Sequence, residues 1–152
     1  MKWLAKLHGL SRVEQRLVLE VGVLLVDIRM ALSLLPFRHV RRFVDQASRR
    51  RLSIEEHTYR ERVVWAATGF GKRLLTKRPC LTQALVVQYL FNRAGYPTQL
   101  RIGVAKGKEN RLMAHAWLKD DESVIIGGHN PALTYTPLKP FQSAAVKPGK
   151  ND

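Results

Sequence analysis

The chain has 152 residues and a single cysteine, Cys80. One cysteine cannot form a disulfide within the chain, so nothing in the sequence points to an oxidising compartment. The five histidines show no metal-ligand spacing with each other or with the cysteine, and we expect neither a metal nor another cofactor. The cysteine therefore has to be explained as a core residue or as a reactive group.

Acidic residues are scarce as well. The sequence has 12 Asp and Glu against 26 Lys and Arg, which gives a formal net charge of +14. Such an excess favours an anionic partner, and nucleic acid, a membrane surface and an acidic peptide all fit that description. Composition alone does not choose among them.

Long apolar runs are missing too. Residues 17–35 are rich in apolar side chains, but Glu20, Asp27 and Arg29 interrupt them, and a helix that spans a bilayer needs about 20 apolar residues. The N-terminal segment lacks the apolar core of a secretory signal. We therefore expect a cytoplasmic protein, with peripheral contact between its basic helices and a membrane as an open alternative.

The first half of the chain is helical in pattern. Capping boxes predict helix starts at Ser11 and Ser53, and the first of these helices should end near Leu34 because a proline follows shortly after it. Apolar residues at helical spacing predict another helix over residues 37–47. The helix that starts at Ser53 should stop at about Thr68, where glycines follow.

The second half contains one helix and several strands. Proline favours the first turn of a helix and glycine the residue after its end, so Pro79 and Gly95 bracket a helix. Its apolar residues lie on most sides, as expected for a central element. Alternation predicts a strand over residues 98–104, and a hairpin should pair residues 112–119 with residues 124–126.

These patterns together predict an α+β fold. A helical region over residues 1–78 precedes a core over residues 79–141, in which the central helix packs on a small antiparallel sheet. Residues 142–152 contain Lys, Pro, Gly, Asn and Asp and are expected to form a disordered tail.

Cys80 and His115 are the residues on which a chemical function would depend. A thiol is nucleophilic as the thiolate, and a helix N-terminus favours that charge, so a cysteine directly after Pro79 is suited to attack. The free N–H groups of the same turn would stabilise an oxyanion. His115 lies in a predicted strand, and a helix-borne cysteine followed by a strand-borne histidine is the order of papain-like and transglutaminase-like enzymes. For each residue taken alone, a purely structural role is the alternative.

Two neighbours of this pair are candidates for contact with a substrate. Trp117 shares the strand face of His115 and would shield the site or bind a substrate side chain, although packing explains it equally well. Gln83 lies one turn into the helix and would face the site entrance, unless it is only a surface residue.

The motifs around this pair follow one another in a recognisable order. They are CLTQAL from Cys80, NRAGYPT from Asn92, LRIGV from Leu100 and AHAW around His115. Together, over residues 78–137, they resemble the transglutaminase-like leader peptidases of lasso-peptide biosynthesis, the B-type processing proteins.

The resemblance implies a cysteine peptidase that removes the leader from a ribosomally made precursor peptide. A separate ATP-dependent lasso cyclase then closes the freed core N-terminus onto a side-chain carboxylate. Such peptidases work with a leader-binding domain, which is fused ahead of them or supplied as a separate chain. Because residues 1–78 show no strand-like alternation, we expect a separate leader-binding protein.

The basic helices offer a docking surface for that partner or for the precursor. The arginines concerned are Arg38, Arg41, Arg42, Arg49, Arg50 and Arg51. A solvated basic face without a specific partner is the alternative.

The third member of a catalytic triad is not evident. The family pattern places an acid about twelve residues after the histidine, where this chain has Gly127. Asp120 and Asp121 come too early, since at about 3.3 Å per residue they lie roughly 16–20 Å along the strand from the histidine, and they are expected to cap the turn. Asn130 would orient the imidazole, as would a backbone carbonyl or a water. His129 is a weaker candidate for the base itself.

Two other functions remain open. The net charge of +14 suits a nucleic-acid-binding protein with a degenerate peptidase fold, but no helix-turn-helix or zinc-ligand pattern supports it, and nucleic acid is the less expected partner. The missing acid suits a non-catalytic scaffold that keeps the thiol only for packing.

Overall fold

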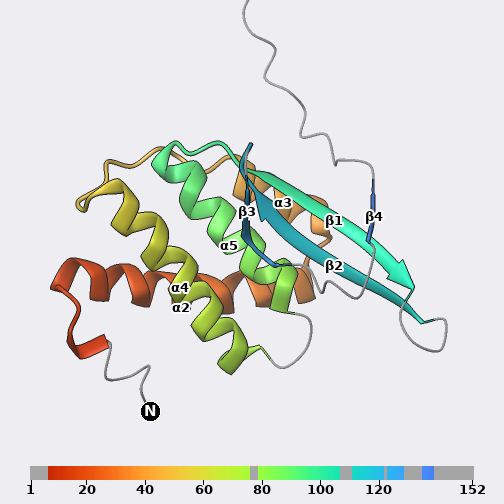
Figure 1. The fold of residues 1–152 in the computed structure, drawn as a ribbon, viewed down its shortest axis with the longest axis horizontal. Helices are drawn as coiled ribbons and strands as arrows, with labels where there is room; N and C mark the ends of the chain where they lie inside the picture. Colours follow the sequence, from red (N-terminus) through yellow and green to blue (C-terminus); the bar gives the residue numbers. More distant parts are fainter. Residues whose placement is uncertain (1–6, 76–78, 107–110, 122, 129–134, 139–152) are drawn as a thin grey trace, which may run out of the picture.

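The computed structural model describes residues 7–75, 79–106, 111–121, 123–128 and 135–138. Within them, four helices precede a four-stranded antiparallel sheet, so the fold is α+β, as the sequence predicts (Figure 1). The helices are α2 (Arg12–Leu34), α3 (Phe37–Asp45), α4 (Glu56–Leu74) and α5 (Pro79–Ala94). The strands are β1 (Gln99–Lys106), β2 (Leu112–Lys119), β3 (Val124–Ile126) and β4 (Thr136–Pro137).

Helix α2 begins as its sequence predicts. The Ser11 hydroxyl accepts a hydrogen bond from the backbone N–H of Glu14, and the Glu14 carboxylate accepts one from the backbone N–H of Ser11. The inner side of the helix carries buried residues, which are Leu17, Val18, Val21, Leu25 and Ile28. In the part of the chain that the structure describes, no helix combines the length and the apolar character needed to cross a membrane.

Helix α4 begins later than its sequence predicts. Glu55, and not Ser53, is the N-cap, because its carboxylate accepts hydrogen bonds from the backbone N–H groups of His57 and Thr58. A carboxylate at this position also interacts favourably with the positive end of the helix dipole, which a serine hydroxyl does more weakly. The helix start predicted at Ser53 is therefore wrong by a few residues.

The same helix also ends later than predicted. It runs past Thr68 to Leu74, so the glycines that follow Thr68 do not terminate it. Gly71 is buried, and a Cβ at this position would collide with the side chain of Gln83 on α5. The absence of a side chain at Gly71 therefore allows α4 and α5 to approach closely.

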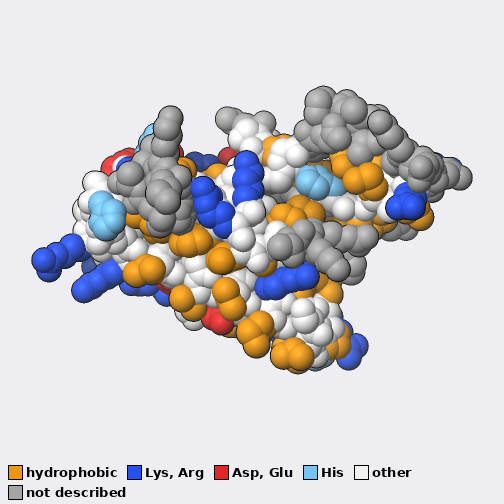
Figure 2. Space-filling model, turned by 90° about the horizontal axis from the view of Figure 1, so that it is seen from below, with side chains coloured by type: hydrophobic (Ala, Val, Ile, Leu, Met, Phe, Trp, Pro, Cys, Tyr) orange, Lys and Arg blue, Asp and Glu red, His pale blue; other side chains and the backbone are white. Residues whose placement is uncertain are grey.

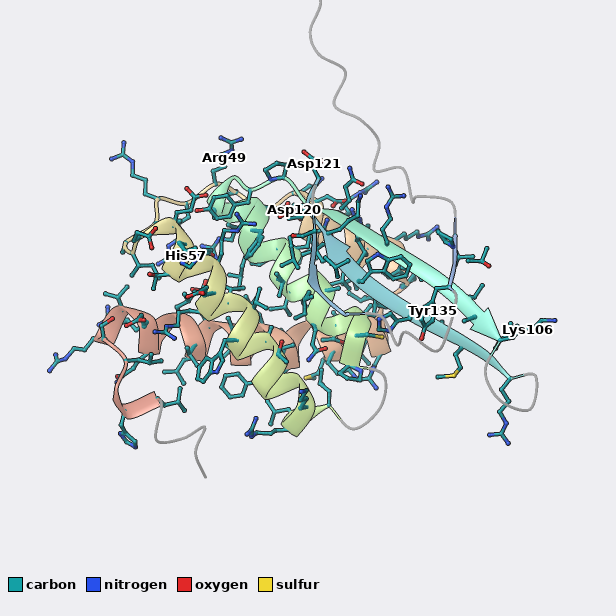
Figure 3. All side chains as sticks on the ribbon, viewed as in Figure 1. Arg49, His57, Lys106, Asp120, Asp121 and Tyr135 are labelled. Atoms are coloured by element: carbon teal, nitrogen blue, oxygen red, sulfur yellow. The ribbon has the colours of Figure 1, made fainter. Side chains whose placement is uncertain are left out.

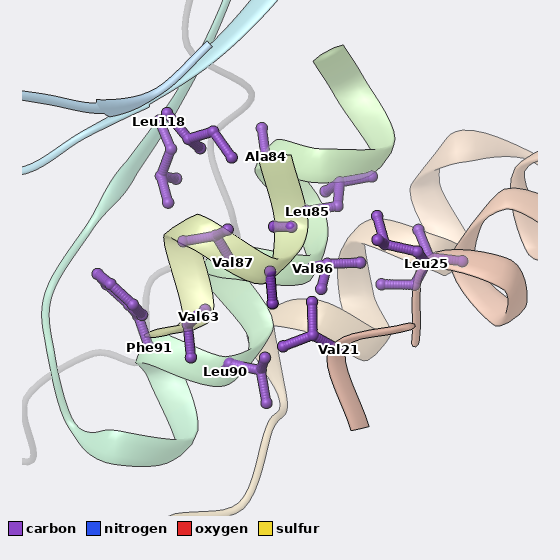
Figure 4. Packing of buried hydrophobic residues seen from close by; sticks show 14 of the residues in the cluster. Val21, Leu25, Val63, Ala84, Leu85, Val86, Val87, Leu90, Phe91 and Leu118 are labelled. Atoms are coloured by element: carbon purple, nitrogen blue, oxygen red, sulfur yellow. The ribbon is translucent and has the colours of Figure 1, made fainter. Parts of the chain in front are cut away.

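Helix α5 is the centre of the fold, as its apolar pattern predicts. Helices α2, α3 and α4 contact it, and β1 and β2 cover another side (Figure 1). Residues from α2, α3, α4, α5, β2 and β3 meet in one cluster (Figure 4), including Val21, Leu25, Val63, Ala84, Leu85, Val86, Val87, Leu90, Phe91 and Leu118. Full burial of a large apolar side chain contributes about 1.5–3 kcal/mol, so this cluster fixes where α5 lies. Gly95, with φ of +85°, follows its end as expected.

The sheet has the strand order β3-β2-β1-β4. The structure confirms the predicted bounds of β2 and β3, whereas β1 continues to Lys106 and β4 has no counterpart in the sequence patterns. In the register of β1 with β2, Gly103 lies opposite His115 and Arg101 lies opposite Trp117. Directly paired residues of antiparallel strands share a face, so Gly103, His115 and Trp117 lie on the same side of the sheet.

Candidate active site

Cys80 and His115 line the same cavity, which has a volume of about 460 Å³. Segments that are far apart in the sequence supply its walls. The other lining residues are Arg29, Leu32, Phe37, Leu81, Thr82, Ile102, Ala114, Ala116 and Leu138. The cavity is therefore mostly apolar and lies where the C-terminal end of α2, the first turn of α5 and the middle of the sheet meet.

Cys80 is the second residue of α5, and its side chain is partly exposed. The first N–H groups of a helix have no partner within the helix, and they form the positive end of its dipole. Thr82 in the same turn is 1% exposed, and its hydroxyl has no hydrogen-bond partner in the described part of the chain. The turn that carries the thiol thus keeps donors available for a negatively charged oxygen or sulfur.

His115 is oriented by the main chain. Its Nε2 atom lies 2.7 Å from the carbonyl oxygen of Gly127. A carbonyl oxygen only accepts hydrogen bonds, so Nε2 must carry a proton in this contact. In the neutral imidazole the lone pair is then on Nδ1, which makes Nδ1 the atom that can act as a base.

Gly127 has no room for a side chain. Its φ is +85°, and a Cβ would lie 2.6 Å from the Ala116 carbonyl oxygen and 2.9 Å from the Trp117 Cα. Residues with a Cβ rarely adopt that φ, and the neighbouring backbone leaves no space for one. The position at which the family pattern has an acid therefore contributes a main-chain carbonyl instead of a carboxylate.

Asp120 does not replace this carbonyl. Asp120 caps the β2–β3 turn, as predicted, with Oδ1 accepting from the Ser123 N–H at 2.7 Å, and its Oδ2 pairs with Arg60 at 3.1 Å. Figure 3 shows Asp120 and Asp121 at one end of the sheet and Lys106 at the other. Asn130 and His129 lie outside the described residues, so their roles stay predictions.

Aromatic rings surround the imidazole. Trp117 stacks on His115 with ring centroids 6.1 Å apart, and the Tyr135 ring centroid lies 5.2 Å from that of His115. Figure 3 shows Tyr135 beside the sheet. Gly103 makes room for both, since a Cβ there would lie 3.0 Å from the Trp117 ring and 3.1 Å from Tyr135 Cβ. Trp117 is 7% exposed and is not among the residues that line the cavity, so it packs beside His115. The structure gives no support to its predicted contact with a substrate.

Gln83 does not face the cavity entrance. Its side chain is buried, and Nε2 donates a hydrogen bond to the Ala67 carbonyl of α4 at 3.1 Å. The expectation that Gln83 faces the site entrance is wrong, because its position on α5 turns it toward α4. Two residues near the site were not anticipated: Tyr135 beside His115, and Arg29 in the cavity wall. Both come from segments that only the tertiary fold brings to the sheet, so no local pattern marks them.

Among the described residues, no group of three or more His, Cys, Asp or Glu side chains is placed to hold a metal ion. The described residues that line the cavity supply a thiol, an imidazole, a hydroxyl and one guanidinium.

Comparison with known proteins assigns the fold. A model described as the transglutaminase-like superfamily matches residues 22–139, which is well over half of the chain and includes Cys80, His115 and Gly127. No curated protein and no solved structure matches significantly. The match begins within α2, so the helices and the sheet belong to one matched region.

Proposed function

The chain belongs to the transglutaminase-like superfamily, whose fold is of the cysteine-peptidase type, and from this membership we propose that it is a cysteine peptidase. More narrowly, we propose that it removes the leader from a lasso-peptide precursor, before an ATP-dependent cyclase closes the macrolactam. The observation that carries the peptidase proposal is the cavity shared by Cys80 and His115, with His115 held by the Gly127 carbonyl. The narrower substrate rests on the resemblance over residues 78–137.

In the proposed first step, His115 Nδ1 takes the proton of the Cys80 thiol while sulfur attacks the carbonyl carbon of the scissile bond. A C–S bond forms, and the carbonyl oxygen becomes an oxyanion that the unpaired N–H groups in the first turn of α5 stabilise. The Gly127 carbonyl accepts a hydrogen bond from Nε2 throughout and so keeps Nδ1 directed at the reacting atoms.

In the second step, the C–N bond breaks and Nδ1–H protonates the leaving amine, which becomes the N-terminus of the core peptide. The leader remains as a thioester on Cys80. Water then gives a proton to the same Nδ1 and attacks the thioester, which releases the leader with a C-terminal carboxylate and restores the thiol.

We further propose that a separate leader-binding protein presents the precursor. Of the arginines considered for docking, Arg41 is occupied, because its guanidinium pairs with Asp45 at 3.0 Å and donates to Gln88 at 2.6 Å. Arg38 and Arg42 on the same helix are exposed, and no described residue pairs with them.

Charge reversal at Arg42 is therefore expected to weaken binding of the leader-binding protein. The control is the same charge reversal at Arg12, which is also exposed. Equal affinity of the Arg42→Glu variant and the unmodified protein would remove this contact from the account.

Leader release tests the function itself. The protein is mixed with a precursor and the leader-binding protein, and the products are followed by mass spectrometry. We expect a leader that ends in a free carboxylate and a core that begins with a free amine, and neither product with Cys80→Ala. Full release by Cys80→Ala would exclude the thiol mechanism, and no release by the unmodified protein would exclude this substrate class.

A further inference from the structure

The cavity beside Cys80 contains a charge that the proposed reaction does not use. Among the described residues that line it, Arg29 is the one with a permanent charge. Arg29 lies on α2, about a turn and a half before the helix ends at Leu34. The rest of the wall consists mainly of apolar side chains such as Leu32, Phe37 and Ile102. A permanent cation in such a wall calls for an explanation.

No residue in the described part of the chain neutralises this cation. Six ion pairs join described residues and none of them includes Arg29, nor does any described side chain or carbonyl hydrogen-bond to its guanidinium. By contrast, Arg41, Arg60, Arg62 and Arg93 each pair with a carboxylate. Arg29 as a whole residue is half-buried, and a guanidinium keeps its charge and its five donors, so it would bind an acceptor that enters the cavity. The missing acceptor is therefore expected to come from the ligand.

We propose that Arg29 binds a side-chain carboxylate of the peptide substrate, close to the scissile bond. The guanidinium offers two parallel N–H donors that match a carboxylate, which a single backbone carbonyl does not use fully. A cavity of 460 Å³ is about 10 Å across if compact, and an extended peptide advances about 3.3 Å per residue. The acidic residue thus lies within about three residues of the bond that Cys80 attacks, and the apolar wall takes an apolar neighbour. This specificity rests on the peptidase function proposed above.

Alkylation of Cys80 tests the proposal without any peptide. Iodoacetate and iodoacetamide attack the same thiolate and differ in carrying a carboxylate or a neutral amide. The ratio of their two rate constants therefore cancels changes in thiolate content and reports on recognition of the carboxylate. Cys80 is the only cysteine, so the added mass identifies the site. We expect Arg29→Gln to lower the iodoacetate-to-iodoacetamide ratio by about tenfold or more, as for loss of a charge-assisted hydrogen bond.

Two matched variants decide between local recognition and overall charge. Arg38→Gln removes the same charge from an exposed site on α3 and should leave the ratio within a factor of two of the original. Arg29→Lys keeps the charge and should retain part of the preference. An unchanged ratio in Arg29→Gln, or an equal fall in Arg38→Gln, would overturn the proposal. If disturbance of the cavity changes the iodoacetamide rate in a variant, the ratio of the two rate constants still reports whether the carboxylate is recognised.

The alkylation result is independent of catalysis. If Cys80→Ala releases leader normally, the peptidase function fails, whatever the alkylation ratio shows. If leader release depends on Cys80 but the iodoacetate-to-iodoacetamide ratio is unchanged in Arg29→Gln, the peptidase function stands and the carboxylate specificity fails. When both hold, replacing acidic residues of the precursor by their amides, one at a time within three residues of the cleavage site, should raise KM at one position. Arg29→Gln should abolish that difference.

Discussion

At the scale of single residues, the account depends on what holds the imidazole of His115. A carboxylate in this role would also stabilise the positive charge that the ring acquires when it takes the thiol proton. The Gly127 carbonyl, 2.7 Å from Nε2, provides the orientation with a partial charge only. Hydrogen bonds with an ionised partner are about twice as strong as neutral ones. In the proposed mechanism, His115 is therefore held in one orientation, as in a triad, but with weaker stabilisation of the imidazolium.

Substitution of Gly127 is expected to damage both stability and activity. In Gly127→Ala, the positive φ and the overlap with the Ala116 carbonyl should lower the free energy of unfolding by about 1–3 kcal/mol, as measured by urea denaturation. Gly127→Asp should not gain activity from its acid, because no Cβ fits there. Gly128→Ala is the control, since nothing lies within 4 Å of a Cβ at that position. A Gly127→Asp variant that folds normally and cleaves faster would contradict the role of the carbonyl.

Chemistry-bearing residues differ in how far the sequence reveals them. Cys80 and His115 follow from local context, the first turn of a helix and a strand within a motif, and the structure brings both to one cavity. Gln83 could not be placed, because the side of α5 that faces α4 depends on the packing of the two helices. Arg29 and Tyr135 reach the site only through the meeting of α2 and the β4 segment with the sheet.

At the scale of elements, the contact between α4 and α5 shows how local rules give way to packing. Two glycines near the end of α4 predicted termination, since glycine weakens a helix by about 1 kcal/mol relative to alanine. The helix continues because Gly71 lets the Gln83 side chain reach the Ala67 carbonyl at 3.1 Å. The β2–β3 hairpin was predicted accurately, because its alternation and its polar turn are local signals.

A double-mutant cycle tests this contact. Gly71→Ala alone should lower the free energy of unfolding by about 1–3 kcal/mol, because its methyl group overlaps the Gln83 side chain. In a Gln83→Ala background the same change should cost much less, since the obstacle is gone. Thermal or urea unfolding of the four proteins gives the coupling energy, expected at about 1 kcal/mol or more. Strictly additive effects would show that Gly71 is not there to accommodate Gln83.

At the scale of the whole molecule, cationic side chains greatly outnumber carboxylates. The face shown in Figure 2 carries Lys and Arg side chains spread among apolar ones, with little acidic surface. Several of the carboxylates join elements that are distant in sequence: Glu14 pairs with Arg62 of α4 at 2.7 Å, and Glu20 pairs with Arg93 of α5 at 2.8 Å. With a net charge of +14, loss of such a carboxylate removes an attraction and adds to the repulsion.

The pair formed by Glu14 predicts a specific response to acid. The hydrogen bond from Arg62, followed by those from Ser11, lowers the pKa of Glu14 from 4.5 to about 2. A carboxylate with a lowered pKa in the folded state stabilises the protein fully above pH 4.5, and this contribution is lost as the pH falls toward 2. Glu14→Gln should therefore be less stable by about 1 kcal/mol at pH 7, since the pair is partly exposed, with the difference shrinking below pH 4.5.

Urea denaturation at several pH values checks this. Glu61→Gln serves as the control, because Glu61 is well exposed and its one ion pair with a described residue is with His57, at 3.8 Å. A stability difference for Glu14→Gln that stays constant between pH 7 and pH 3 would contradict the linkage.

The central claim is that Cys80 and His115 act as one catalytic unit. The most direct test measures single-turnover leader release by three variants: Cys80→Ala, His115→Ala and the double variant. We expect the rate of leader release to fall severely in Cys80→Ala and by at least about a hundredfold in His115→Ala. The double variant should be no slower than Cys80→Ala alone, because removing one of two residues that act as a unit already removes the effect of both. Losses that multiply in the double variant, or leader release by Cys80→Ala at the original rate, would contradict it.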